Sequence, residues 1–228
     1  MTVLVDIQVV QLLCSRLCHD MVGPSGAVHN GMELYNEMDT ADGADALKMV
    51  SSSVEQLSSR LAFFRMAFGL GGLSGRKPRL LEAHDMAADF LRPGRITLNW
   101  PVDQASEAEQ NLSVSAIKLM LNMILVATDA LPRGGSLGIS IAKLSETGET
   151  PGTGMAIKAS GEGARLKDDL LEALTPKTED GIADVLTAHN IHGYFCTKMA
   201  QNMGGEIELS VGQDEVQLAV LIPDETES

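Results

Sequence analysis

The chain has 228 residues, enough for one large domain or two small ones, and 44% of them are hydrophobic, so a buried core can form. Its formal net charge of −14 argues against nucleic-acid binding, which requires a basic surface. No apolar run reaches the length of a membrane span and the first residues lack the pattern of a secretory signal, so we expect a cytoplasmic protein with no membrane partner. The three cysteines are too scattered for a disulfide framework, and we expect no metal site and helix-packing roles for Cys14 and Cys18.

A long amphipathic helix is predicted from Thr2 to Met38. Its apolar residues recur at spacings of three, four or seven, which places them on one side of a helix. His19 lies about 160° from the Leu17 direction at 3.6 residues per turn, so its side chain is expected to point away from that side. The apolar positions are Val10, Leu13, Leu17, Met21, Val28, Met32, Tyr35 and Met38.

A second long helix is predicted after a polar turn at residues 39–43. Its apolar residues alternate spacings of three and four from Leu47 to Phe68, which is a heptad pattern. Two such helices joined by a short loop form an antiparallel hairpin, assigned here to residues 1–72. A lone hairpin buries one face of each helix, so we expect a homodimer that forms a four-helix bundle; the alternative is that both helices pack on the rest of the same chain.

Residues 69–78 have the glycine-rich composition of a linker. Helical and strand patterns then alternate up to residue 223, and an acidic tail covers residues 224–228. Helices gathered against one mixed sheet form a two-layer α/β sandwich, so the predicted fold class is α+β, with the sandwich at residues 78–223. The expected helices are 79–91, 105–131, 166–174 and 181–203, and the expected strands are 95–100, 136–144, 154–159, 206–210 and 216–222.

His19 is the candidate functional residue of the first helix. Pro24 follows five residues later and costs on the order of 3 kcal/mol inside a helix. A bend that shapes a docking surface would explain why the helix contains it; the alternative is that His19 is an ordinary exposed residue. The side chains expected around His19 on the outer face are small, and they are Ser15, Gly23, Gly26 and Asn30.

The pattern His19-Asp20-x-x-x-Pro24 resembles the phosphoacceptor motif of sensor histidine kinases and of phosphotransferases built on the same dimerisation domain. In those proteins the histidine carries a phosphoryl group, the adjacent acid serves as a base or an orienting group, and the proline bends the helix. The order of elements after the linker similarly resembles the ATP-binding domain of histidine kinases.

Three ATP-binding motifs of that domain are altered in this sequence. Val126 stands where the kinases place an asparagine that helps to bind Mg²⁺, and Ala159 replaces the aspartate that contacts adenine. Residues 189–195 lack most of the glycines of the second glycine-rich box. Adenine recognition, Mg²⁺ retention and close wrapping of the phosphates would all be lost, so we expect no ATP binding. His189 and His192 are three residues apart and could face a ligand; the interpretation favoured here is that they are surface residues at the start of a helix.

The whole chain resembles the ChpT-type histidine phosphotransferases of alphaproteobacteria. The most specific parts are Cys18-His19-Asp20, residues 30–34 and the jointly altered ATP motifs. The resemblance implies a phosphotransferase rather than an ATP-dependent kinase, with no cofactor of its own. A CckA-like hybrid histidine kinase would pass a phosphoryl group from its receiver domain to His19. His19 would pass it to CtrA-like and CpdR-like response regulators of the cell cycle, with Mg²⁺ supplied by the partner receiver.

The candidate site residues follow from the resemblance and from their positions on the helix. His19 would attack as a neutral imidazole, and Asp20 would accept a hydrogen bond from a ring N–H or orient the ring. Arg16 would offset phosphate charge, or would be a solvated surface arginine. Two other functions stay open, an active kinase with a divergent nucleotide site and a non-catalytic dimeric scaffold that binds receivers. The expected partner contacts are Leu12 and Met21 as apolar flanks, with Ser15, Gly23, Gly26 and Asn30 as the rim.

Overall fold

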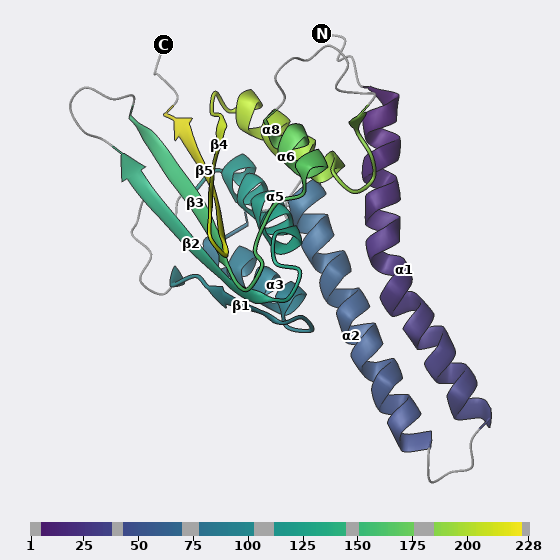
Figure 1. The fold of residues 1–228 in the computed structure, drawn as a ribbon. Coiled ribbons are helices and arrows are strands. Elements are labelled where there is room, and N and C mark those ends of the chain that lie inside the picture. Colours follow the sequence, from purple (N-terminus) through teal and green to yellow (C-terminus); the bar gives the residue numbers. More distant parts are fainter. Residues whose placement is uncertain are drawn as a thin grey trace.

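The computed structural model describes residues 6–37, 43–69, 78–102, 112–144, 151–175 and 185–224. A helical hairpin stands beside a five-stranded sheet, with shorter helices between the two (Figure 1). This arrangement confirms the expected α+β fold. The expected turn at residues 39–42, the linker at 70–77 and the acidic tail after residue 224 lie outside the described residues.

The hairpin consists of α1 (Ile7–Glu37) and α2 (Gly43–Phe68), which run antiparallel (Figure 1). The Asp6 carboxylate accepts a hydrogen bond from the amide of Gln8, at 2.8 Å, and so caps the start of α1. Gly31 is buried where the two helices cross, and a Cβ there would lie 2.7 Å from Cγ2 of Val50. Glycine at this position therefore permits the close approach of α1 and α2.

Pro24 lies inside α1, and the helix changes direction partway along its length (Figure 1). An interior proline removes one backbone hydrogen bond and its ring displaces the preceding turn, which accounts for such a bend. Among the described helices, none combines the length and the apolar character needed to cross a membrane.

The sandwich is built on one mixed sheet with the strand order β1-β2-β3-β5-β4. The β1 and β2 strands pair in parallel and the other neighbours pair antiparallel. The helices cover one face of the sheet (Figure 1). The strands are β1 (Ile96–Asn99), β2 (Gly135–Leu144), β3 (Gly152–Ser160), β4 (Ile207–Gly212) and β5 (Glu215–Pro223), and the helices are α3 (Leu80–Leu91), α5 (Val114–Asp129), α6 (Asp168–Leu174) and α8 (Ile191–Asn202).

The central helix α5 joins the sheet to the hairpin. Eleven of the 16 residues of α5 are buried, because the helix contacts β3 and β5 on one side and α2 on the other. Asn122 is fully buried, and its Nδ2 donates to the carbonyl oxygens of Ala67, at 3.1 Å, and Lys118, at 2.9 Å. Since Ala67 lies near the end of α2, this side chain fixes the hairpin against the sandwich.

Two of the expected helices are shorter than predicted. The helix expected from residue 105 begins at Val114 in the described part, where the Ser113 hydroxyl accepts a hydrogen bond from the amide of Ala116, at 3.1 Å. The helix expected over residues 181–203 is present, but its expected start is wrong, because α8 begins only at Ile191 and residues 188–190 form a turn.

Asn190 accounts for the late start of α8. Its Oδ1 accepts a hydrogen bond from the amide of Thr187, at 2.7 Å, and its Nδ2 donates to the carbonyl oxygens of Val185, at 3.0 Å, and Asp169, at 3.2 Å. Such local bonds from an asparagine compete with the helical hydrogen-bond pattern. The turn before α8 is thereby held against the start of α6.

Candidate functional site

His19 lies in α1 and its side chain is 70% exposed, in agreement with the expected outward orientation. Its Nδ1 is 3.3 Å from Oδ1 of Asp20. In the tautomer with hydrogen on Nδ1, the Nδ1–H group donates a hydrogen bond to this carboxylate, and the lone pair of Nε2 is free for a reaction partner. The geometry is that of an oriented nucleophile on an open surface.

Asp20 connects the histidine to Arg16. While Oδ1 faces His19, Oδ2 accepts a hydrogen bond from Nε of Arg16 at 3.0 Å, one helical turn away. The Asp20 side chain is largely buried by these contacts. Asp20 can therefore orient the imidazole and compensate positive charge that develops on the ring.

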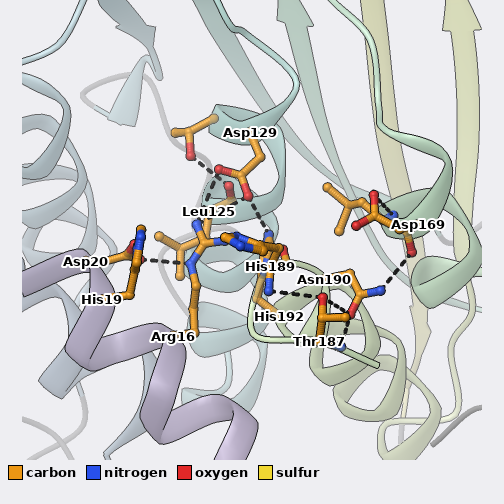
Figure 2. Close-up of polar contacts among 12 residues, drawn as sticks. Arg16, His19, Asp20, Leu125, Asp129, Asp169, Thr187, His189, Asn190 and His192 are labelled. Carbon is orange, nitrogen blue, oxygen red and sulfur yellow. Dashed lines mark hydrogen bonds and ion pairs between the residues drawn. The ribbon is translucent and has the colours of Figure 1, made fainter. Parts of the chain in front are cut away.

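Arg16 is largely buried, so its interpretation as a solvated surface arginine is wrong. Its Nη2 lies 3.2 Å from Oδ2 of Asp129, and its Nη1 donates to the carbonyl oxygen of His189 at 3.2 Å (Figure 2). Burial alone would lower the pKa of Arg16, but the charges of Asp129 and Asp20 outweigh it and raise that pKa. Arg16 thus joins the hairpin to two segments of the sandwich.

Asp129 and His192 form a pair at the candidate site that the sequence interpretation missed. Asp129 is the last residue of α5, and its Oδ2 lies 3.0 Å from Nε2 of His192 in the first turn of α8 (Figure 2). Burial alone would raise the pKa of Asp129, but the contacts with His192 and Arg16 outweigh it and lower that pKa. The Asp129 carboxylate therefore pairs with both the guanidinium of Arg16 and the imidazole of His192.

The expectation that His192 is a surface residue is wrong, because 1% of it is exposed. The first turn of α8 packs against α5 and α6, which encloses the ring, while His189 remains exposed as expected. One feature of the sequence could have indicated that Asp129 has a cationic partner. An aspartate at the C-terminal end of a helix opposes the helix dipole, so it is expected to need a cationic partner.

A hollow of about 360 Å³ lies between α1 and the sandwich, in front of His19. Two elements bring basic side chains to its wall, since Arg16 comes from α1 and Lys167 precedes α6. The ring of His189 also lines the hollow, with its centroid 5.9 Å from that of His19 and the two planes at 81°. The hollow therefore combines an exposed imidazole with hydrogen-bond donors of both parts of the chain.

The other expected contact residues fall into two groups. Leu12 and Met21 are half-buried and pack within the chain, Leu12 near Ile191 and Met21 against the main core. They are not freely exposed flanks of the histidine, and their role in partner binding stays a prediction. Cys14 and Cys18 are exposed, so neither packs within this chain, and Cys18 lines an apolar groove of the hairpin. The small residues of the expected rim are all exposed, and they are Ser15, Gly23, Gly26 and Asn30.

The family model of the histidine phosphotransferase C-terminal domain matches residues 80–215. The chain therefore belongs to the histidine phosphotransferase family. It is 30% identical over 205 residues to the protein phosphotransferase ChpT of Brucella abortus (strain 2308), which covers 90% of this chain and 91% of that protein. A solved structure of a bacterial phosphotransferase at 1.7 Å superposes with a TM-score of 0.74 and 27% identity, over 96% of this chain and 98% of the other.

Proposed function

We propose that this chain is the histidine phosphotransferase of a phosphorelay and that His19 carries the phosphoryl group. The observation that carries the proposal is the exposed His19 ring, whose Nδ1 faces Asp20 and whose Nε2 is open, in a member of this family. The proposed donor is the receiver domain of a CckA-like hybrid histidine kinase. The proposed acceptors are the receivers of CtrA-like and CpdR-like response regulators.

The transfer step asks for little covalent chemistry from the protein. The Nε2 lone pair of His19 attacks the phosphorus of the donor's aspartyl phosphate; the N–P bond forms, the P–O bond breaks and the donor carboxylate leaves. The ring gains positive charge while Nδ1 keeps its proton, and Asp20 compensates that charge at 3.3 Å. The acidic pocket of the receiver would supply Mg²⁺, and transfer to the acceptor would reverse these steps.

We propose further that the sandwich does not bind ATP. Val126 and Ala159 stand at the altered metal and adenine positions, and both side chains are fully buried in the core. Neither residue offers a polar group, so a nucleotide would find no metal ligand at residue 126 and no acceptor for the adenine amino group at residue 159. This supports a phosphoryl supply from another protein.

A phosphotransfer assay tests the proposal. The chain is mixed with a receiver domain of the CckA-like class that carries labelled phosphate, and the label is then chased with a CtrA-like receiver. We expect acid-labile, base-stable label that peptide mapping places on His19 and that the chase removes. Label acquired directly from ATP and Mg²⁺ would indicate a kinase, and stable complex formation without labelling would indicate a scaffold; either result would contradict the proposal.

The hairpin supports a homodimer as part of the same proposal. An apolar groove of about 620 Å³ runs along it, lined among others by Leu17, Met21, Val22, Leu61 and Phe64. Val22 is 66% exposed and Leu61 is 49% exposed. An apolar surface that continues over both helices is typical of a bundle interface, and a second hairpin would cover it. Further exposed apolar residues of the hairpin are Met32, Leu34, Tyr35, Leu47, Met49 and Val54.

A Leu61→Glu variant is expected to be a monomer. A carboxylate on the wall of the apolar groove would lose its hydration in the bundle without gaining a partner, which disfavours association by several kcal/mol. Sedimentation equilibrium of both proteins measures the difference. Val211→Glu is the matched control, since Val211 is an exposed apolar residue of β4 on the sandwich. A Leu61→Glu protein that stays dimeric, or a monomeric wild type, would contradict the homodimer.

A further inference from the structure

We propose that the imidazole of His189 binds the phosphoryl group on His19, so that the sandwich contributes a binding group to the phosphotransfer site. The inference rests on the proposed role of His19. The two rings come from residues 170 positions apart and meet at one hollow, with 5.9 Å between their centroids. Oxygens of a phosphoryl group on His19 would extend into the space that the His189 ring borders.

The ring nitrogens of His189 make no polar contact with the described part of the chain. No hydrogen bond or ion pair of the ring nitrogens occurs among the described residues, and the contact of the ring is with His19. The backbone of His189 is held instead, since its carbonyl oxygen accepts from Nη1 of Arg16 at 3.2 Å and its amide donates to Oγ1 of Thr187 at 3.3 Å. The donors of the ring are therefore available to a ligand.

The turn that carries His189 is fixed before any ligand arrives. Asn190 is 1% exposed and bonds with Thr187, Val185 and Asp169, while Arg16 holds the turn against α1. Arg16 is itself held by Asp129, which also faces the buried His192. A binding group that is positioned in advance loses little entropy when the ligand forms.

The charges around His19 create a need for such a group. A phosphoryl group brings negative charge into a hollow whose wall already carries Asp20, Asp129 and Asp169. The positive charge of Arg16 is already shared between two of these carboxylates, Asp20 and Asp129. A histidine can donate a charge-assisted hydrogen bond to a phosphoryl oxygen, as Lys167 at the wall of the hollow also can.

The test measures how labelled phosphate is partitioned at equilibrium between a receiver aspartate and His19. A His189→Ala variant is expected to lower the equilibrium constant for transfer to His19 about tenfold, which corresponds to about 1.4 kcal/mol at 25 °C. His189→Gln keeps a neutral donor and is expected to lose less. Because Arg16 and Thr187 contact only the backbone of His189, both variants should keep the fold, which thermal unfolding checks.

The control is His84→Gln, which changes a histidine of α3 that does not line the hollow. A second readout is the NMR signal of the His189 ring, which is expected to shift on phosphorylation of wild type and to stay unchanged in His19→Gln. The inference would be overturned if the equilibrium constant for transfer to His19 in His189→Ala were within twofold of wild type. It would also be overturned if His84→Gln changed that constant as much as His189→Ala does. Either result would leave His19 as the acceptor. A wild type that takes no label from any phosphorylated receiver would overturn the proposed function itself.

Discussion

A His19→Gln variant is expected to take up no acid-labile phosphate from a phosphorylated receiver, a loss of at least about 10³-fold in initial rate. Glutamine keeps a polar side chain of similar length on the exposed face of α1, but its amide nitrogen has no lone pair that can attack phosphorus. Receiver-to-protein transfer, followed by acid-sensitive label over the first seconds of mixing, measures the effect.

His29→Gln is the matched control for this experiment. His29 lies on the same helix and is 73% exposed, with Nε2 3.3 Å from Oε1 of Glu33, but it does not line the hollow in front of His19. Its replacement should leave transfer within twofold of wild type. Equal losses in the two variants would show that any exposed histidine of α1 is labelled, and retained labelling of His19→Gln would remove His19 from the mechanism.

An Asp129→Ala variant is expected to lose about 2 kcal/mol of unfolding free energy and to transfer phosphate about tenfold more slowly. Breaking a buried ion pair costs roughly 3–5 kcal/mol, and we expect less here because the Asp129 side chain is 32% exposed. The loss leaves Arg16 without its partner on α5 and leaves the buried His192 ring without a carboxylate. Urea unfolding and the transfer assay measure the two effects.

A double-mutant cycle with Arg16→Ala shows whether the two residues act together. The combined loss of stability should be smaller than the sum of the single losses, because each variant already removes the same contact. Additive losses would mean that the contact between α1 and α5 contributes nothing to stability.

The pH dependence of stability follows from the lowered pKa of Asp129. A carboxylate whose pKa is lower in the folded state stabilises the fold above its unfolded pKa of about 3.9, and this contribution is lost as pH falls through the folded value. Below about pH 4 the difference in unfolding free energy between wild type and Asp129→Asn should therefore shrink. A difference that stays constant from pH 6 to pH 3 would contradict this assignment.

The sequence predicts the hairpin and most of the sheet because their signals are local. Apolar residues at helical spacing mark α1 and α2, and alternating strands with glycine turns mark β2 and β5. The outward position of His19 follows from the same helical arithmetic, and the exposure of its side chain agrees with it. These features need no knowledge of contacts between distant residues.

The contacts of Arg16 could not be predicted in this way. They depend on residues 113 and 173 positions away, and helical periodicity reports only which face a residue occupies. The burial of His192 could not be predicted for a similar reason. The turn formed by Asn190 moves the start of α8, and this changes which side chains of α8 are enclosed. Positions of single polar residues at a junction between two parts of a fold require the tertiary structure.

Pro24 has one more effect on the turn that carries His19. A proline has no amide hydrogen, so residue 24 cannot donate to the carbonyl oxygen of Asp20, four positions earlier. The carbonyl oxygen of Asp20 is therefore without its usual helical donor. A carbonyl oxygen that lacks its helical donor can accept a hydrogen bond from water or from another molecule.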